Sequence, residues 1–119
     1  PDMVRKFVMP AIEEEVRFLN NSCFHLDGPG ALTHLDDILS IKELDAVQWL
    51  PGAGAKPQHE WPEVLHKIQA AGKAIVVYAD CELVKQMHKE YKPELVVYQV
   101  KADSREQAEE LLNWLKKNT

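Results

Sequence analysis

Apolar residues recur along this chain with two periods, one typical of amphipathic helices and one typical of β-strands. The helical period predicts five helices: 2–20, 31–40, Trp61 to Gly72, 81–91, and the segment after Ser104. Runs that are β-branched or that alternate apolar with polar residues predict four strands: 22–27, 45–50, 74–79 and 95–100. This order, an N-terminal helix followed by four strand–helix units, predicts right-handed crossovers and a parallel α/β sheet.

Individual residues mark where these elements bend, begin or end. Pro10 should kink or divide the first helix, because proline cannot donate the helical hydrogen bond. Ser104 with Gln107 three residues later forms the capping-box pattern for the last helix. Asp80 stands where it can cap the helix that follows it, which we favour over a role as an acid or base.

One side of the predicted sheet is polar and the other is largely apolar. The polar alternation draws on all four strands: Cys23, His25, Asp27, Ala46, Gln48, Leu50, Val76, Tyr78, Asp80, Val97, Gln99 and Lys101. A doubly wound sheet is covered by helices on both faces, whereas barrel strands turn one face to the lumen and carry function at their C-terminal ends. We therefore predict an α/β fold that is half of a (βα)8 TIM barrel with four parallel strands. An open flavodoxin-like sheet is the alternative.

The length of the chain bears on its organisation. A complete barrel needs about 250 residues, so we expect residues 1–119 to form a single half-barrel domain, a fragment of a longer chain. Such a fragment exposes its lumen face and sheet edges, and we expect it to form a homodimer or to bind the missing half. A self-sufficient α/β interaction module without an active site is the competing interpretation.

Composition excludes several classes of function. The net charge is −5, and the 14 Lys and Arg are scattered among 19 Asp and Glu, so nucleic acid is a poor candidate partner. No apolar run approaches the roughly 20 residues that span a bilayer, and no signal-peptide pattern is present, so we expect no membrane association. Two widely separated cysteines, Cys23 and Cys81, favour a reducing, cytoplasmic location over a disulfide framework.

The strongest candidate site lies where the first strand ends. His25 and Asp27 project from one side of that strand, and Gly28-Pro29-Gly30 must then turn. With Cys81, these two side chains are candidate ligands of a metal such as zinc; alternatively, His25 is merely hydrogen-bonded and Asp27 caps the next element. Gly28 could bring backbone N–H groups to an anionic substrate, or it could simply form a tight turn. Gln48 could hold a ligand in the same pocket.

Three segments carry a resemblance to a known family. They are Phe24 to Ala31 (FHLDGPGA), His34 to Asp36 (HLD) and Leu44 to Gly52 (LDAVQWLPG). In this order they resemble the uroporphyrinogen decarboxylase superfamily, particularly its corrinoid-linked methyltransferase-like members. The resemblance covers essentially the whole chain and implies the C-terminal half of that family's barrel, acting on a small methylated substrate or a corrinoid cofactor.

The resemblance also implies site residues and partners. In the methyltransferase branch, a His-x-Cys pair and a later Cys bind zinc; His25 falls on that histidine, Asp27 replaces the first cysteine, and Cys81 does not match the later one. The implied substrate-binding residues are His25, Asp27, Gly28 and Gln48, and the implied partners are the missing N-terminal half-barrel and a corrinoid protein. A decarboxylase fragment is the alternative within the family, although the histidine near the last strand is absent.

Overall fold

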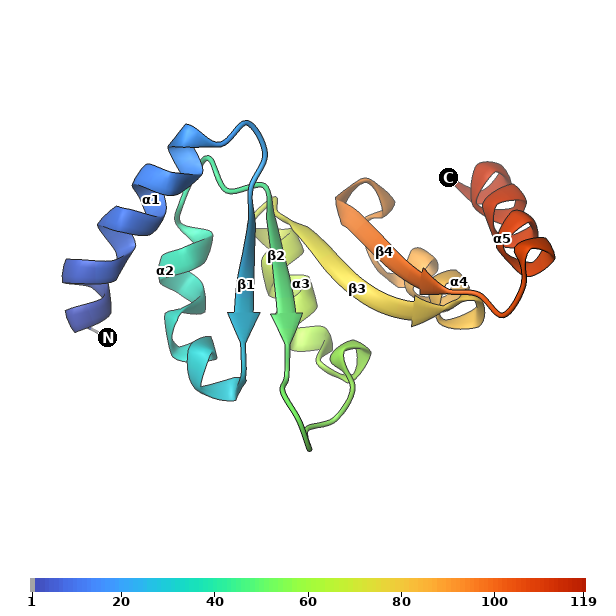
Figure 1. Ribbon diagram of the computed structural model, residues 1–119, viewed down its shortest axis with the longest axis horizontal. Coiled ribbons are helices and arrows are strands. Elements are labelled where there is room, and N and C mark those ends of the chain that lie inside the picture. Colours follow the sequence, from blue (N-terminus) through green and yellow to red (C-terminus); the bar gives the residue numbers. More distant parts are fainter. Residues whose placement is uncertain (1) are drawn as a thin grey trace.

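The four strands form one parallel sheet in the order β1-β2-β3-β4 (Figure 1), as seen in a computed structural model that describes residues 2–119. The strands are β1 Cys23–Asp27, β2 Ala46–Leu50, β3 Ala74–Asp80 and β4 Val96–Lys101. Each strand lies beside its neighbour in sequence, as in a barrel, whereas a flavodoxin-like sheet has the order 2-1-3-4-5. The predicted α/β half-barrel fold with an N-terminal helix is therefore confirmed.

Five α-helices connect and flank the strands (Figure 1). They are α1 Met9–Phe18, α2 Leu35–Leu39, α3 Pro62–Ala70, α4 Cys81–Glu90 and α5 Arg105–Asn118. Short 3-10 turns occupy Pro29–His34, Gln58–Glu60 and Pro93–Leu95. None of the helices within residues 2–119 combines the length and apolarity that crossing a bilayer requires.

At Pro10 the predicted first helix changes its helical type but is not interrupted. A π-helical turn covers Val4–Val8, and the backbone N–H of Met9 donates to the carbonyl oxygen of Val4, five residues earlier. Pro10 has no N–H to donate, and its ring crowds the preceding turn. The wider π turn accommodates this proline without ending the helix.

The helix predicted over 31–40 is only half α-helical. Residues Pro29–His34 form a 3-10 turn, and regular α-helix is confined to Leu35–Leu39. The Thr33 hydroxyl donates to the carbonyl oxygen of Gly30 over 3.0 Å, and no side chain caps the N-terminus of the turn. Local side-chain bonds of this kind compete with the helical ladder, which explains the tighter turn.

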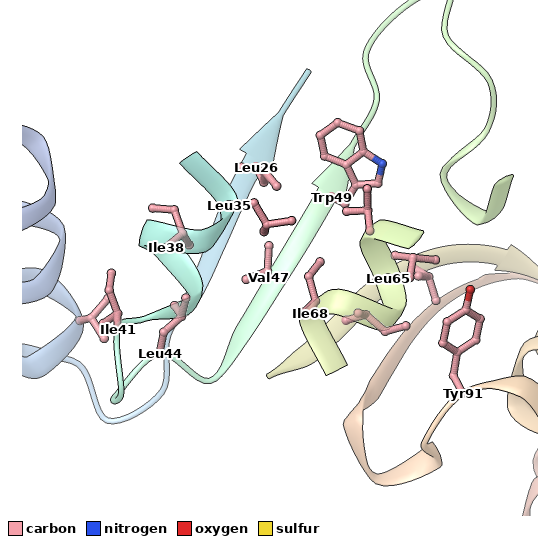
Figure 2. Close-up of a cluster of buried hydrophobic side chains, with 14 of the residues drawn as sticks. Leu26, Leu35, Ile38, Ile41, Leu44, Val47, Trp49, Leu65, Ile68 and Tyr91 are labelled. Carbon is pink, nitrogen blue, oxygen red and sulfur yellow. The ribbon is translucent and has the colours of Figure 1, made fainter. Parts of the chain in front are cut away.

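The core lies on one face of the sheet, between the strands and the helices (Figure 2). Leu26, Val47 and Trp49 on β1 and β2 are at most 1% exposed. They pack with apolar residues of the helices and their flanks: Leu35, Ile38, Leu65, Ile68 and Tyr91. On the opposite alternation His25, Asp27 and Tyr78 remain exposed, and Gln48 is half-buried. The structure thus has the predicted polar face and the predicted apolar face of the sheet.

Strands β2 and β3 pair over only two positions, Ala46 with Ala74 and Val47 with Ile75, and then diverge (Figure 1). The side chain of Gln58, 8% exposed, fills the gap. Its Nε2 donates to the carbonyl oxygens of Trp49 (2.6 Å) and Val76 (2.7 Å), and its Oε1 accepts from the backbone N–H of Tyr78 (3.0 Å). One amide therefore replaces the missing ladder bonds and fixes Tyr78 on β3.

Candidate functional site

A pocket lies at the C-terminal ends of β1, β2 and β3. Its volume is about 420 Å³, and its walls combine strand ends with the loop after β2: Asp27, Leu50, Pro51, Gly52, Ala55, Lys56, Pro57, Gln58, His59 and Tyr78. Asp27, Leu50 and Tyr78 project into it from three successive strands. This is the end of a parallel sheet at which barrel enzymes carry their active sites.

Beside the pocket, three polar side chains form a continuous hydrogen-bonded row across the open face of the sheet, here called the polar ladder: His25, Gln48 and Tyr78. His25 and Gln48 are register partners on β1 and β2. The Nδ1 of His25 lies 2.9 Å from Oε1 of Gln48, and Nε2 of Gln48 donates to the Tyr78 hydroxyl oxygen over 3.1 Å. The structure therefore brings His25 and Gln48 together and adds Tyr78, which sequence reasoning placed on this face but not in the site.

Gly28 adopts a positive φ of 77° immediately after β1. Its N–H donates to the carbonyl oxygen of Leu50 over 2.8 Å, and its own carbonyl oxygen accepts from Ala31 over 3.0 Å. Only glycine adopts this backbone conformation without strain. Because its N–H is already bonded within the fold, the geometry favours the tight turn over a direct contact with an anion.

Asp27 keeps its carboxylate exposed at the edge of the pocket. The 3-10 turn that follows has Gly28 at its cap position and receives no side-chain cap, so Asp27 does not perform the expected capping role. Within residues 2–119, Asp27 forms no hydrogen bond or ion pair through its carboxylate. The oxygen atoms are thus available to accept from a ligand.

Cys81 lies apart from the polar ladder. It is the first residue of α4, is 4% exposed, and packs in an apolar cluster with Ala79, Val84 and Leu111. Across the described part of the chain, residues 2–119, no three His, Cys, Asp or Glu side chains gather as a metal site would require. The donors present do not fit a zinc centre built from His25, Asp27 and Cys81, because Cys81 is buried in a different cluster and does not join the other two side chains.

Two further histidines, His66 and His88, have defined partners in the fold. His66 stacks on Tyr91, and its Nε2 lies 3.2 Å from the carboxylate oxygen Oε1 of Glu90. His88 is buried against Trp114, although it lies on a helix rich in charged residues. Both contacts join residues more than 20 positions apart, and neither lies at the pocket.

Comparison with known proteins gives no family assignment. No protein-family model, no curated protein and no solved structure matches this chain significantly. The likeness to the uroporphyrinogen decarboxylase superfamily therefore stays a prediction that rests on the three motif segments.

Proposed function

We propose that this chain is the C-terminal half of a uroporphyrinogen decarboxylase-like barrel that acts as a methyltransferase on a small methylated substrate or a corrinoid cofactor. The observation that carries this proposal is the polar ladder across the open face of the sheet, next to a pocket of about 420 Å³ at the C-terminal ends of β1, β2 and β3. Barrel enzymes place their chemistry at this end of the sheet. The methyl-transfer assignment is supported by the motif residues around His25 and Gln48.

The chemistry of the pocket suits a small polar ligand. Asp27 offers acceptor oxygens on one wall, while Tyr78 and Lys56 offer donors on another. In a closed barrel these groups would face a lumen shielded from water, where hydrogen bonds and charge interactions are stronger than at an open surface. The open face would then become the inner wall of an active site.

The proposed partner is a complementary half-barrel. Both edge strands, β1 and β4, have one unpaired side within the described chain, and Asp27 and Lys101 place opposite charges at their C-terminal ends. An eight-stranded barrel carries eight helices, of which this chain supplies five. A partner of four strands and three connecting helices completes that number, which favours the missing N-terminal half over a second copy. A corrinoid protein would dock on the completed barrel.

Ligand binding tests this proposal directly. Amide resonances of the 119-residue chain should shift on titration with methylcobalamin or tetramethylammonium, and the shifts should be confined to the pocket. For methylcobalamin, whose amide groups carry acceptor oxygens, Tyr78→Phe should weaken binding, whereas Tyr98→Phe, the same change on the helix-covered face, should not. Absence of binding by both probes, or equal binding by both variants, would contradict the proposal.

A mass measurement tests the partner. On coexpression with the segment encoded upstream, a one-to-one complex is expected in light scattering. A homodimer that persists in the presence of that segment would instead identify a second copy as the occupant of the open edges.

A further inference from the structure

The polar ladder has a direction. At its centre, the Gln48 amide presents its oxygen to Nδ1 of His25 and its nitrogen to the hydroxyl oxygen of Tyr78, at 2.9 and 3.1 Å. An amide oxygen can only accept and an amide nitrogen can only donate. The protons along the ladder are therefore placed by Gln48.

This direction fixes the state of both neighbours. Since the amide oxygen accepts, Nδ1 of His25 must carry a proton, which leaves Nε2 with the lone pair when the ring is neutral. Since the amide nitrogen donates, the Tyr78 oxygen is the acceptor in that bond, and the phenolic proton is left for a third partner. Tyr78 lines the pocket, where a bound ligand could accept this proton.

We propose that Gln48 is a positioning residue that makes Tyr78 a hydrogen-bond donor to a ligand in the pocket. The ligand class follows: a small molecule that presents a carbonyl or carboxylate oxygen to Tyr78 and an N–H or O–H group to Asp27. This inference rests on the proposed function of the pocket as a ligand site. It adds the hydrogen-bonding groups that the ligand must carry.

In the observed orientation of the Gln48 amide, the bond to His25 is retained whatever the charge of the His25 ring. With the oxygen facing Nδ1, the bond is made whether the His25 ring is neutral or protonated, because Nδ1 carries hydrogen in both states. The reversed amide would need a bare Nδ1 and would lose its bond on protonation. Only the observed orientation keeps Tyr78 donating to the pocket in both states of His25.

The first test determines the tautomer of His25 in the absence of any ligand. In ¹⁵N spectra of histidine-labelled protein at a pH where the ring is neutral, His25 should be protonated at Nδ1 and bare at Nε2. Gln48→Leu should shift His25 toward the Nε2-protonated form that predominates in solution, whereas Gln99→Leu, on the exposed face of β4, should leave it unchanged. An Nε2-protonated His25 in the unaltered chain would overturn the inference.

The second test measures whether Tyr78 donates a hydrogen bond to acetamide, a probe that has both a carbonyl oxygen and N–H groups. Acetamide should shift the pocket amides, and Tyr78→Phe should weaken its binding about fivefold, the worth of one net hydrogen bond. Gln48→Glu should weaken it similarly, because a carboxylate would accept the Tyr78 proton. Binding unaffected by Gln48→Glu would overturn the positioning role. A correct tautomer with no acetamide binding would refute the ligand class, and failure of the methylated probes as well would refute the proposed function.

Discussion

Replacing Gln58 with leucine should destabilise the fold strongly. The side chain is 8% exposed and makes three hydrogen bonds to the backbone of β2 and β3, through Trp49, Val76 and Tyr78. Leucine has a similar volume, so packing is largely retained, but two carbonyls and one N–H lose their partner. A buried group without a partner costs about 1–3 kcal/mol.

Three such groups therefore cost at least about 3 kcal/mol, a large part of the roughly 5–15 kcal/mol that stabilises a typical domain. Urea unfolding should show a midpoint lower by about 1–3 M with an unchanged slope. Gln86→Leu, on the exposed face of α4, is the matched control and should stay within about 0.5 kcal/mol of the parent. A Gln58→Leu midpoint equal to that of the control would refute the reasoning. In that case hydrogen exchange at the backbone N–H of Tyr78 should also be no faster in the variant than in the parent.

Three further changes test other parts of the fold. Asp80→Ala removes the bond of 2.8 Å from the N–H of Leu83 at the start of α4 and should cost about 1 kcal/mol in denaturant unfolding, whereas Asp80→Asn should cost less. Lys73→Met leaves two carbonyl oxygens without their buried ammonium donor and should cost about 2 kcal/mol or more by the same measurement. Burial raises the pKa of Tyr98 to about 12, so stability should fall as pH rises from about 10 to 12, and Tyr98→Phe should reduce that fall.

The sign of the alkaline effect follows from proton binding. Above pH 10 the unfolded chain loses its tyrosine proton while the folded chain keeps the one on Tyr98, so the folded state binds more protons and stability declines with pH. The Tyr98 hydroxyl is buried without a hydrogen-bond partner within residues 2–119, which is why burial dominates. An alkaline decline that is identical in Tyr98→Phe would contradict this explanation.

The sequence predicted the order of the elements and the two faces of the sheet because both depend on local periodicity. Alternation along β1 placed His25 on the side opposite Leu26, and alternation along β2 placed Gln48 opposite Trp49. Parallel pairing without an offset then made His25 and Gln48 neighbours. Sidedness and order were thus enough to predict half of the polar ladder.

What the sequence could not predict depends on contacts between distant segments. Gln58 looks like an ordinary loop residue, because nothing near it in sequence indicates that β2 and β3 diverge after two paired positions. His88 sits in a helix with charged neighbours, and only the return of α5 beside α4 buries it against Trp114. Cys81 follows a strand end, yet the start of α4 turns it into the apolar cluster away from His25.

Three of the chain's glutamines, Gln48, Gln58 and Gln69, differ in what their amide groups bond. Gln58 and Gln69 are buried, and each donates to two backbone carbonyls and accepts from one backbone N–H, so their capacity is used to hold the chain together. Gln48 instead bonds two side chains on the exposed face. Its row ends at a Tyr78 hydroxyl whose proton has no acceptor within the described residues. The amides of Gln58 and Gln69 therefore stabilise the fold, whereas the Gln48 row would leave one directed donor, the Tyr78 hydroxyl, for the proposed ligand.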